Sequence, residues 1–153
     1  MTCLLVFLLT ASTWLAFKMS AADWRRRIIP DVYLFPFMLA GMIVVSYFPW
    51  VSSAGESAIA AAAGYGLGAG LGRIFEKFAK RRASSVPPIG MGDIKLLAAG
   101  GIWLGTNGLA IAVAASCALG IIWGIWKKQK YIPFAPFFFA GSIISLICLL
   151  FLI

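Results

Sequence analysis

The sequence predicts an all-α, polytopic membrane protein with about six transmembrane helices and both termini on the outer side. Composition, hydropathy runs and the charges between those runs support this prediction. Of the 153 residues, 62% are hydrophobic and only 12% are charged, whereas a soluble domain is about half apolar and about a quarter charged. A soluble chain of this length could not bury so much apolar surface, so lipid is the expected solvent.

Six stretches approach the roughly 20 apolar residues that a transmembrane helix needs. They lie at about 2–22, 32–52, 57–75, 93–106, 108–126 and 134–153. The first lacks the basic residues that open a signal peptide, so we expect it to be retained. The stretch at 93–106 is short enough to form a re-entrant helix instead. Together the runs predict a single transmembrane domain over residues 1–153.

Basic and uncharged connections alternate between these runs. The basic clusters Arg25–Arg27, Lys77–Arg82 and Lys127–Lys130 follow the first, third and fifth runs, while 49–56 and 105–107 contain no Lys or Arg. Basic loops stay on the cytoplasmic side of a membrane, so the alternation supports six spans. We therefore attribute the net charge of +8 to the orientation of the helices in the membrane and to contact with anionic lipids, and we do not expect nucleic-acid binding.

The third run is rich in glycine. Gly64, Gly68 and Gly72 recur every fourth residue, and Gly66 and Gly70 form a second track. The run lacks the preceding strand and the Gly-Lys-Ser/Thr ending of a phosphate-binding loop. We therefore expect the glycines to let two membrane helices approach closely.

The sequence contains no histidine, and its three cysteines, Cys3, Cys117 and Cys148, lie far apart in apolar runs. Neither a zinc site nor imidazole-based catalysis is predicted, and a serine nucleophile would have no histidine to pair with. We expect no metal and no cofactor. Chemistry must then come from carboxylates, lysines, hydroxyls or the backbone.

Three of the five acidic residues lie at predicted helix ends on the cytoplasmic side: Asp23, Asp31 and Asp93. Acids at membrane depth are costly and indicate function by default, although each could simply cap its helix. The other two, Glu56 and Glu76, are expected to be solvated.

Asp93 follows Gly90 and Gly92, which interrupt regular helix and leave room for the backbone of a peptide substrate. Two close carboxyl groups would share one proton, a state that suits peptide hydrolysis. The dipoles of their own helices favour Asp93 as the base and Asp23 as the acid. The arginines after Asp23 act in the opposite direction, so the assignment of roles stays open.

Three segments resemble one known family in the order in which that family has them. GMGDIKLLAAGGIWLG resembles the G-x-G-D motif and following helix of the type IV prepilin peptidases, polytopic aspartic proteases of bacterial inner membranes. AADWRRRIIPD resembles the first catalytic segment of that family, and YIPFAPFFFAG its later Ile-Pro-x-x-Pro-Phe segment.

The resemblance implies that Asp23 and Asp93 are the catalytic aspartates, with Gly90, Gly92 and Pro30 as supporting motif residues. It implies prepilins or pseudopilins as substrates, cut on the cytoplasmic side before their hydrophobic segment. The expected location is the bacterial inner membrane, where the chain would cross several times.

Three further features bear on the site or on the expected activity. Asp31 stands where the family usually has Asn after Ile-Pro. Lys95, two residues past Asp93, either extends toward lipid phosphates or helps to fix the substrate leader or the charge of the acid pair. The larger family members carry a cytosolic insert with paired Cys-x-x-Cys motifs and often methylate the new pilin N-terminus. The chain instead resembles the short form associated with Flp/Tad-type pili, which implies no methyltransferase activity.

The sequence is also compatible with two other functions. A small proton-coupled transporter would show repeated halves and acids near the bilayer midplane. A non-catalytic membrane scaffold could be built on the glycine-rich run. The oligomeric state is open.

Overall fold

The computed structural model describes residues 2–48, 52–81, 89–128 and 132–152. In these ranges the chain forms the helices α1 (Thr2–Arg26), α2 (Asp31–Tyr47), α3 (Ala54–Arg81), α4 (Met91–Lys127) and α5 (Phe134–Leu152). The all-α prediction is confirmed. The loop residues 49–51, Arg82, Lys130 and Tyr131, which took part in the predictions above, lie outside the described residues.

The composition of the helices and their exposed side chains identify a membrane protein. By length and hydropathy, α1, α3, α4 and α5 could each cross a membrane, and α2 is a shorter apolar helix. Large apolar side chains cover the outside, among them Phe17 (69% exposed), Val32 (78%) and Phe151 (88%). Water would strongly disfavour such a surface, whereas hydrocarbon would not.

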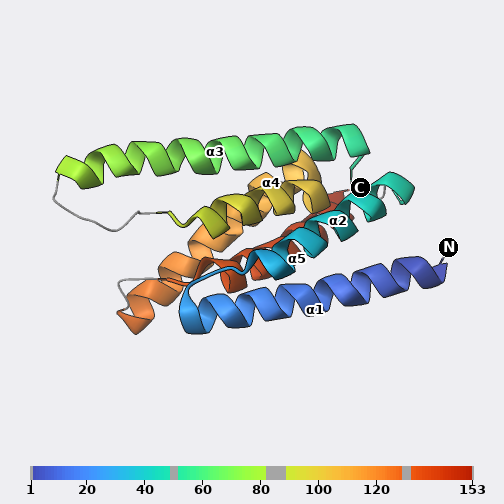
Figure 1. Cartoon of the computed structure of the whole chain (residues 1–153), viewed down its shortest axis with the longest axis horizontal. Coiled ribbons are helices and arrows are strands. Elements are labelled where there is room, and N and C mark those ends of the chain that lie inside the picture. The colour runs from blue at the N-terminus through green and yellow to red at the C-terminus, as the bar shows by residue number, and fades with distance from the viewer. Residues whose placement is uncertain (1, 49–51, 82–88, 129–131, 153) are drawn as a thin grey trace.

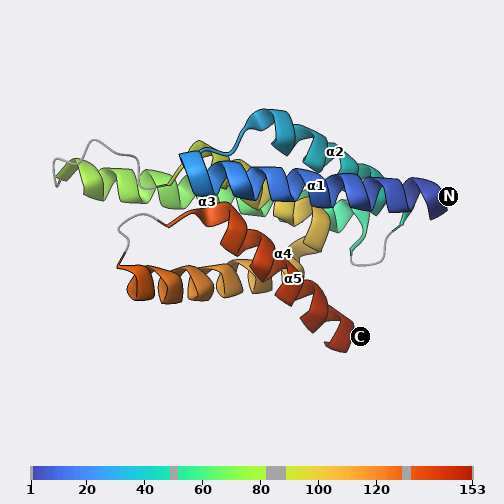
Figure 2. The ribbon, with the colours of Figure 1, turned by 90° about the horizontal axis from the view of Figure 1, so that it is seen from below.

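The sequence predicted separate helices at 93–106 and 108–126, and α4 consists of two helical parts that meet at Gly105. Gly105 has φ 67° and ψ −174°, a conformation that is essentially restricted to glycine. The parts of α4 before and after this residue fold back on each other and run in opposite directions (Figures 1 and 2). The predicted boundary at 105–107 thus coincides with a reversal of the chain at Gly105.

Helix α4 packs against α2, α3 and α5, while α1 packs against α2 and α5. Both termini lie at the right-hand end of the view, and α1 ends at the left, where α2, α4 and α5 begin (Figure 1). The three acids predicted to be cytoplasmic lie in the last turn of α1 and the first turns of α2 and α4. The fold therefore brings their segments to one end of the bundle.

The glycine track of α3 packs on α4 as the sequence predicted. A Cβ atom added to Gly64 would lie 2.7 Å from the carbonyl oxygen of Leu97, and one added to Gly68 would lie 3.3 Å from Ile94. The second track, Gly66 and Gly70, has nothing within 4 Å. The first track therefore allows the close contact, and it touches α4 directly after Asp93.

Candidate active site

Asp23 lies in the last turn of α1 and is only 4% exposed. Its Oδ2 accepts a hydrogen bond of 2.8 Å from the backbone N–H of Ala135, at the start of α5. The backbone N–H of Phe134 interacts with the same carboxyl group, and the positive charge of Arg27 acts on it. The first turn of α5 therefore holds an acid that belongs to another helix.

Asp93 is the third residue of α4, and the preceding Gly90 is the N-cap in an extended conformation. The Asp93 carboxyl group interacts with the backbone N–H of Gly90, while its own N–H donates to the Gly90 carbonyl at 3.1 Å. An acid at the third helical position that reaches back to the N-cap N–H forms one half of a capping box. This contact fixes the carboxyl group at the helix start.

The two acids are neighbours in space, although they are far apart in the sequence. The negative charge of Asp23 acts on Asp93, so the end of α1 and the start of α4 place both carboxyl groups at one site. Carboxyl groups within hydrogen-bonding distance of each other would share a proton, because both cannot easily ionise. Such a pair can accept a proton from water with one group and donate a proton with the other.

The two motif glycines differ in what they contact. A Cβ atom on Gly92 would lie 3.0 Å from the Cβ of Ile29, so the residue lets the segment between α1 and α2 pack on α4. Gly90 is exposed, and an added Cβ would meet only the carboxyl group of Asp93. The expected room for a substrate backbone is therefore at Gly90, whereas Ile29 occupies the space beside Gly92.

Pro30 and Asp31 begin α2 beside this site. The Pro30 carbonyl accepts hydrogen bonds from the N–H groups of Tyr33 and Leu34, which starts the helix. The Lys95 ammonium donates to both carboxyl oxygens of Asp31, at 2.7 and 2.8 Å. Lys95 thus has a partner that neither sequence interpretation had considered, and the ion pair joins α2 to α4.

The resemblance to prepilin peptidases predicts cleavage activity, and replacing Asp31 with Asn should leave that activity within about threefold and change the free energy of unfolding by under about 1 kcal/mol. The Lys95 and Asp31 side chains are 30% and 49% exposed, and an amide oxygen could still accept one hydrogen bond from the ammonium. Initial cleavage rates and thermal unfolding in detergent test this. A loss of activity as large as that expected for Asp93→Asn would place Asp31 in the catalytic chemistry.

An apolar layer lies one helical turn below the acids. Met19, Leu34, Leu96 and Phe138 are fully buried and belong to one cluster, and each is three or four residues from Asp23, Asp31, Asp93 or Ala135. Three to four residues make one turn of about 5.4 Å. The layer closes the site toward the middle of the bundle.

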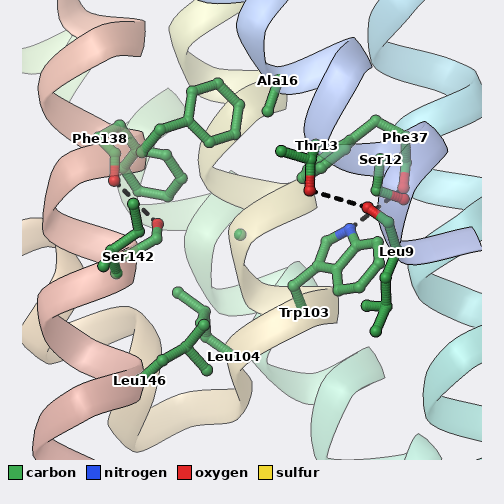
Figure 3. Close-up of a pocket in the computed structure, with 13 residues that line it drawn as sticks. Leu9, Ser12, Thr13, Ala16, Phe37, Trp103, Leu104, Phe138, Ser142 and Leu146 are labelled. Atoms are coloured by element: carbon green, nitrogen blue, oxygen red, sulfur yellow. Dashed lines mark hydrogen bonds between the residues drawn. The ribbon is translucent and has the colours of Figure 1, made fainter. Parts of the chain in front are cut away.

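A cavity of about 280 Å³ lies deeper, between α1, α2, α4 and α5 (Figure 3). Its lining is mostly apolar, with Leu9, Phe37, Trp103 and Phe138 among the residues, and includes neither acid. The buried hydroxyl of Ser12 also lines it and has no hydrogen-bond partner among the described residues. The cavity is thus separate from the carboxyl pair.

Sequence reasoning missed the contact between Asp23 and α5. The sequence did carry a signal for the helix start that makes this contact, because the Ile-Pro pair at 132–133 has the same form as the pair at 29–30, which precedes α2. Both pairs begin a helix. No group of three metal-ligating side chains occurs in the part of the chain that the structure describes.

Comparison with known proteins identifies the family. Residues 4–125 match the type IV leader peptidase family. The chain belongs to this family. The matched segment contains both acids and ends before α5, and it confirms the resemblance seen in the sequence.

Curated relatives in this family are named prepilin leader peptidase/N-methyltransferase. One from Burkholderia pseudomallei strain 1026b is 36% identical over 135 residues, covering 84% of this chain and 42% of the relative. One from Aeromonas salmonicida strain A449 is 30% identical over 145 residues, covering 88% and 47%. The chain therefore spans less than half the length of these relatives. The search of solved structures gave no match.

Proposed function

We propose that this member of the type IV leader peptidase family is a membrane aspartic endopeptidase that removes the leader from prepilins or pseudopilins. Cleavage takes place at the cytoplasmic face and uses Asp23, Asp93 and an activated water. The observation that carries the proposal is that the end of α1 and the start of α4 place these two acids at one end of the bundle, where the charge of Asp23 acts on Asp93. The buried layer beneath them supports it, because a site closed on that side keeps the pair poorly solvated and its electrostatic interactions strong.

The proposed reaction needs one proton on the pair. The ionised carboxylate takes a proton from water, whose oxygen attacks the scissile carbonyl carbon, and the protonated carboxyl group donates to the carbonyl oxygen. In the second step a proton passes to the amide nitrogen, the C–N bond breaks, and a diol hydroxyl returns a proton to the pair. The products are a carboxylic acid and an amine, and the pair again holds one proton.

We propose that the chain crosses the bacterial inner membrane six times, with both termini outside and the Gly105 reversal at the outer face. The opposite directions of the two parts of α4 support this count (Figure 2). Trp24 directly follows Asp23 in the sequence. It packs against Trp123 with ring centroids 5.5 Å apart. Tryptophan collects at membrane–water interfaces, which fits the acid pair at a boundary in contact with lipid head groups.

We also propose that the substrates are Flp-type prepilins and that cleavage occurs without methylation. The family resemblance ties methylation to larger members with paired Cys-x-x-Cys motifs. In this chain Cys3, Cys117 and Cys148 are all free and belong to α1, α4 and α5. No two of these cysteines form a Cys-x-x-Cys motif, which supports the proposal of cleavage without methylation.

The test uses the purified protein in lipid bilayers with a panel of prepilins, one with a Flp-type leader and others with longer leaders. Mass spectrometry of the products, with a methyl donor present, should show a cut leader and an unmethylated new N-terminus. No cleavage of any substrate by correctly inserted protein, under conditions in which a known prepilin peptidase cuts them, would contradict the proposal. A methylated product would contradict only the second part.

A further inference from the structure

The first turn of α5 has an unusual set of backbone donors. The first N–H groups of a helix have no partner within it. In this turn Pro133 and Pro136 have no N–H, so Phe134 and Ala135 supply the free donors. Both interact with the carboxyl group of Asp23, and the Ala135 bond is 2.8 Å long. The free donors of this turn are thus directed at one acid.

We infer that the first turn of α5 is a positioning site that keeps Asp23 ionised, so that Asp23 is the general base and Asp93 carries the shared proton. The inference rests on the proposed function for its catalytic part. It concerns a segment, Phe134–Pro136, to which the proposed reaction gives no other role. Phe134 and Ala135 are positioning residues, because they act through Asp23.

The surroundings of the two acids decide which of them holds the charge. Asp23 accepts from two backbone N–H groups at the positive end of the α5 dipole, and the Arg27 charge acts on it. Asp93 interacts with one N–H, that of Gly90, at the start of its own helix. Hydrogen bonds to an ionised group are roughly twice as strong as neutral ones, so the second donor and the arginine favour the charge on Asp23.

Three influences oppose this assignment. Asp23 is almost fully buried, which disfavours a charge on it, and Asp93 lies in the first turn of α4, where the α4 dipole favours a negative charge. Asp23 lies near the C-terminus of α1, where the α1 dipole disfavours a negative charge. The two dipoles act on the carboxyl groups from a distance, whereas the α5 donors contact Asp23 directly, and burial disfavours a charge on Asp93 as well. We infer that the direct contacts outweigh these influences. The roles are therefore the reverse of those that the dipoles of each acid's own helix had suggested.

The assignment fixes the direction of each proton transfer. Water gives a proton to Asp23 as its oxygen bonds to the carbonyl carbon, and Asp93 gives its proton to the carbonyl oxygen. Asp23 then protonates the amide nitrogen as the C–N bond breaks, while Asp93 takes a proton from one hydroxyl of the diol. Each acid returns to its starting state.

The decisive variant replaces the peptide N–H of Ala135 with an ester oxygen, by incorporating lactic acid at position 135. It removes the donor and adds no atoms. The matched control is the ester at Val32, incorporated as the α-hydroxy analogue of valine. Val32 is also the second residue of a helix that follows Ile-Pro, and its side chain is 78% exposed. Ala135→Pro and Val32→Pro form a second pair that ordinary mutagenesis provides.

The first readout needs no catalysis. In an Asp93→Asn background, infrared spectroscopy follows protonation of the Asp23 carboxyl group, assigned by subtracting the Asp23→Asn/Asp93→Asn spectrum. The ester at 135 should move the titration midpoint up by about one pH unit, a tenfold change in the protonation equilibrium. The ester at 32 should not move it. An unchanged midpoint at 135 would overturn the positioning role, whether or not the wild type cleaves prepilin.

The second readout is the dependence of kcat/KM on pH in the otherwise unmodified protein. The acidic limb should move to higher pH in the 135 ester, and activity should recover as the pH is raised. An equal loss at every pH would show a merely structural role. Retained activity at neutral pH with an alkaline limb moved upward would place the proton on Asp23 and overturn the assignment of the base.

Discussion

Replacing Asp23 or Asp93 with Asn should each lower the rate of prepilin cleavage by about 10²- to 10⁴-fold. Asn has nearly the shape of Asp, and its amide oxygen can still accept the hydrogen bond that Ala135 donates to Asp23. It cannot take a proton from water or donate one as an acid. The loss should therefore appear in the rate, while the amount of inserted protein and its thermal unfolding stay close to those of the wild type.

The control for these variants is Glu56→Gln, which removes a carboxylate from the first turn of α3. Glu56 approaches the Gly105 reversal and has no place in the proposed reaction, so this variant should cleave at the wild-type rate. Initial rates on one prepilin in bilayers provide the comparison. Full activity in either Asp→Asn variant would eliminate the pair as the catalytic centre. Wild-type behaviour in both is what a non-catalytic scaffold would show.

The position of the acid pair could be predicted from the sequence because topology depends on coarse patterns. Apolar runs and alternating basic loops set the direction of each helix, and direction alone brings the end of α1 and the start of α4 to one side. The glycine track was also readable, since close contact between membrane helices needs small residues at a fixed spacing. The structure places Gly64 and Gly68 of this track against α4.

The contacts between helices that are distant in the sequence could not be read in the same way. A dipole argument based on the sequence considers only the helix to which a residue belongs. Asp23, however, is held by the start of α5, 112 residues later. Likewise, Lys95 forms an ion pair with Asp31, and this contact depends on how α2 and α4 pack together in space. Hydropathy also could not show that the chain reverses at Gly105 through the backbone of a single glycine.

Replacing Gly101 with Ala should destabilise the protein by about 1–3 kcal/mol, the typical cost of overpacking a well-packed interior. The added Cβ would lie 2.5 Å from the carbonyl carbon and oxygen of Ala60 and from the nitrogen of Ala61. These are backbone atoms of α3, so no side-chain rotation can relieve the contact. The two helices must separate, and the close packing that holds membrane helices together is lost.

The matched control is Gly66→Ala, which adds the same methyl group to α3 where nothing lies within 4 Å. It should leave stability unchanged or raise it slightly, because Ala has the higher helix propensity. Thermal unfolding in detergent measures both variants, and equal midpoints would contradict the packing argument. Gly101→Ala should also slow cleavage, since Gly68 of α3 packs on Ile94, the residue after Asp93. A displacement of α3 would therefore displace the start of α4, and with it the position of Asp93 relative to Asp23.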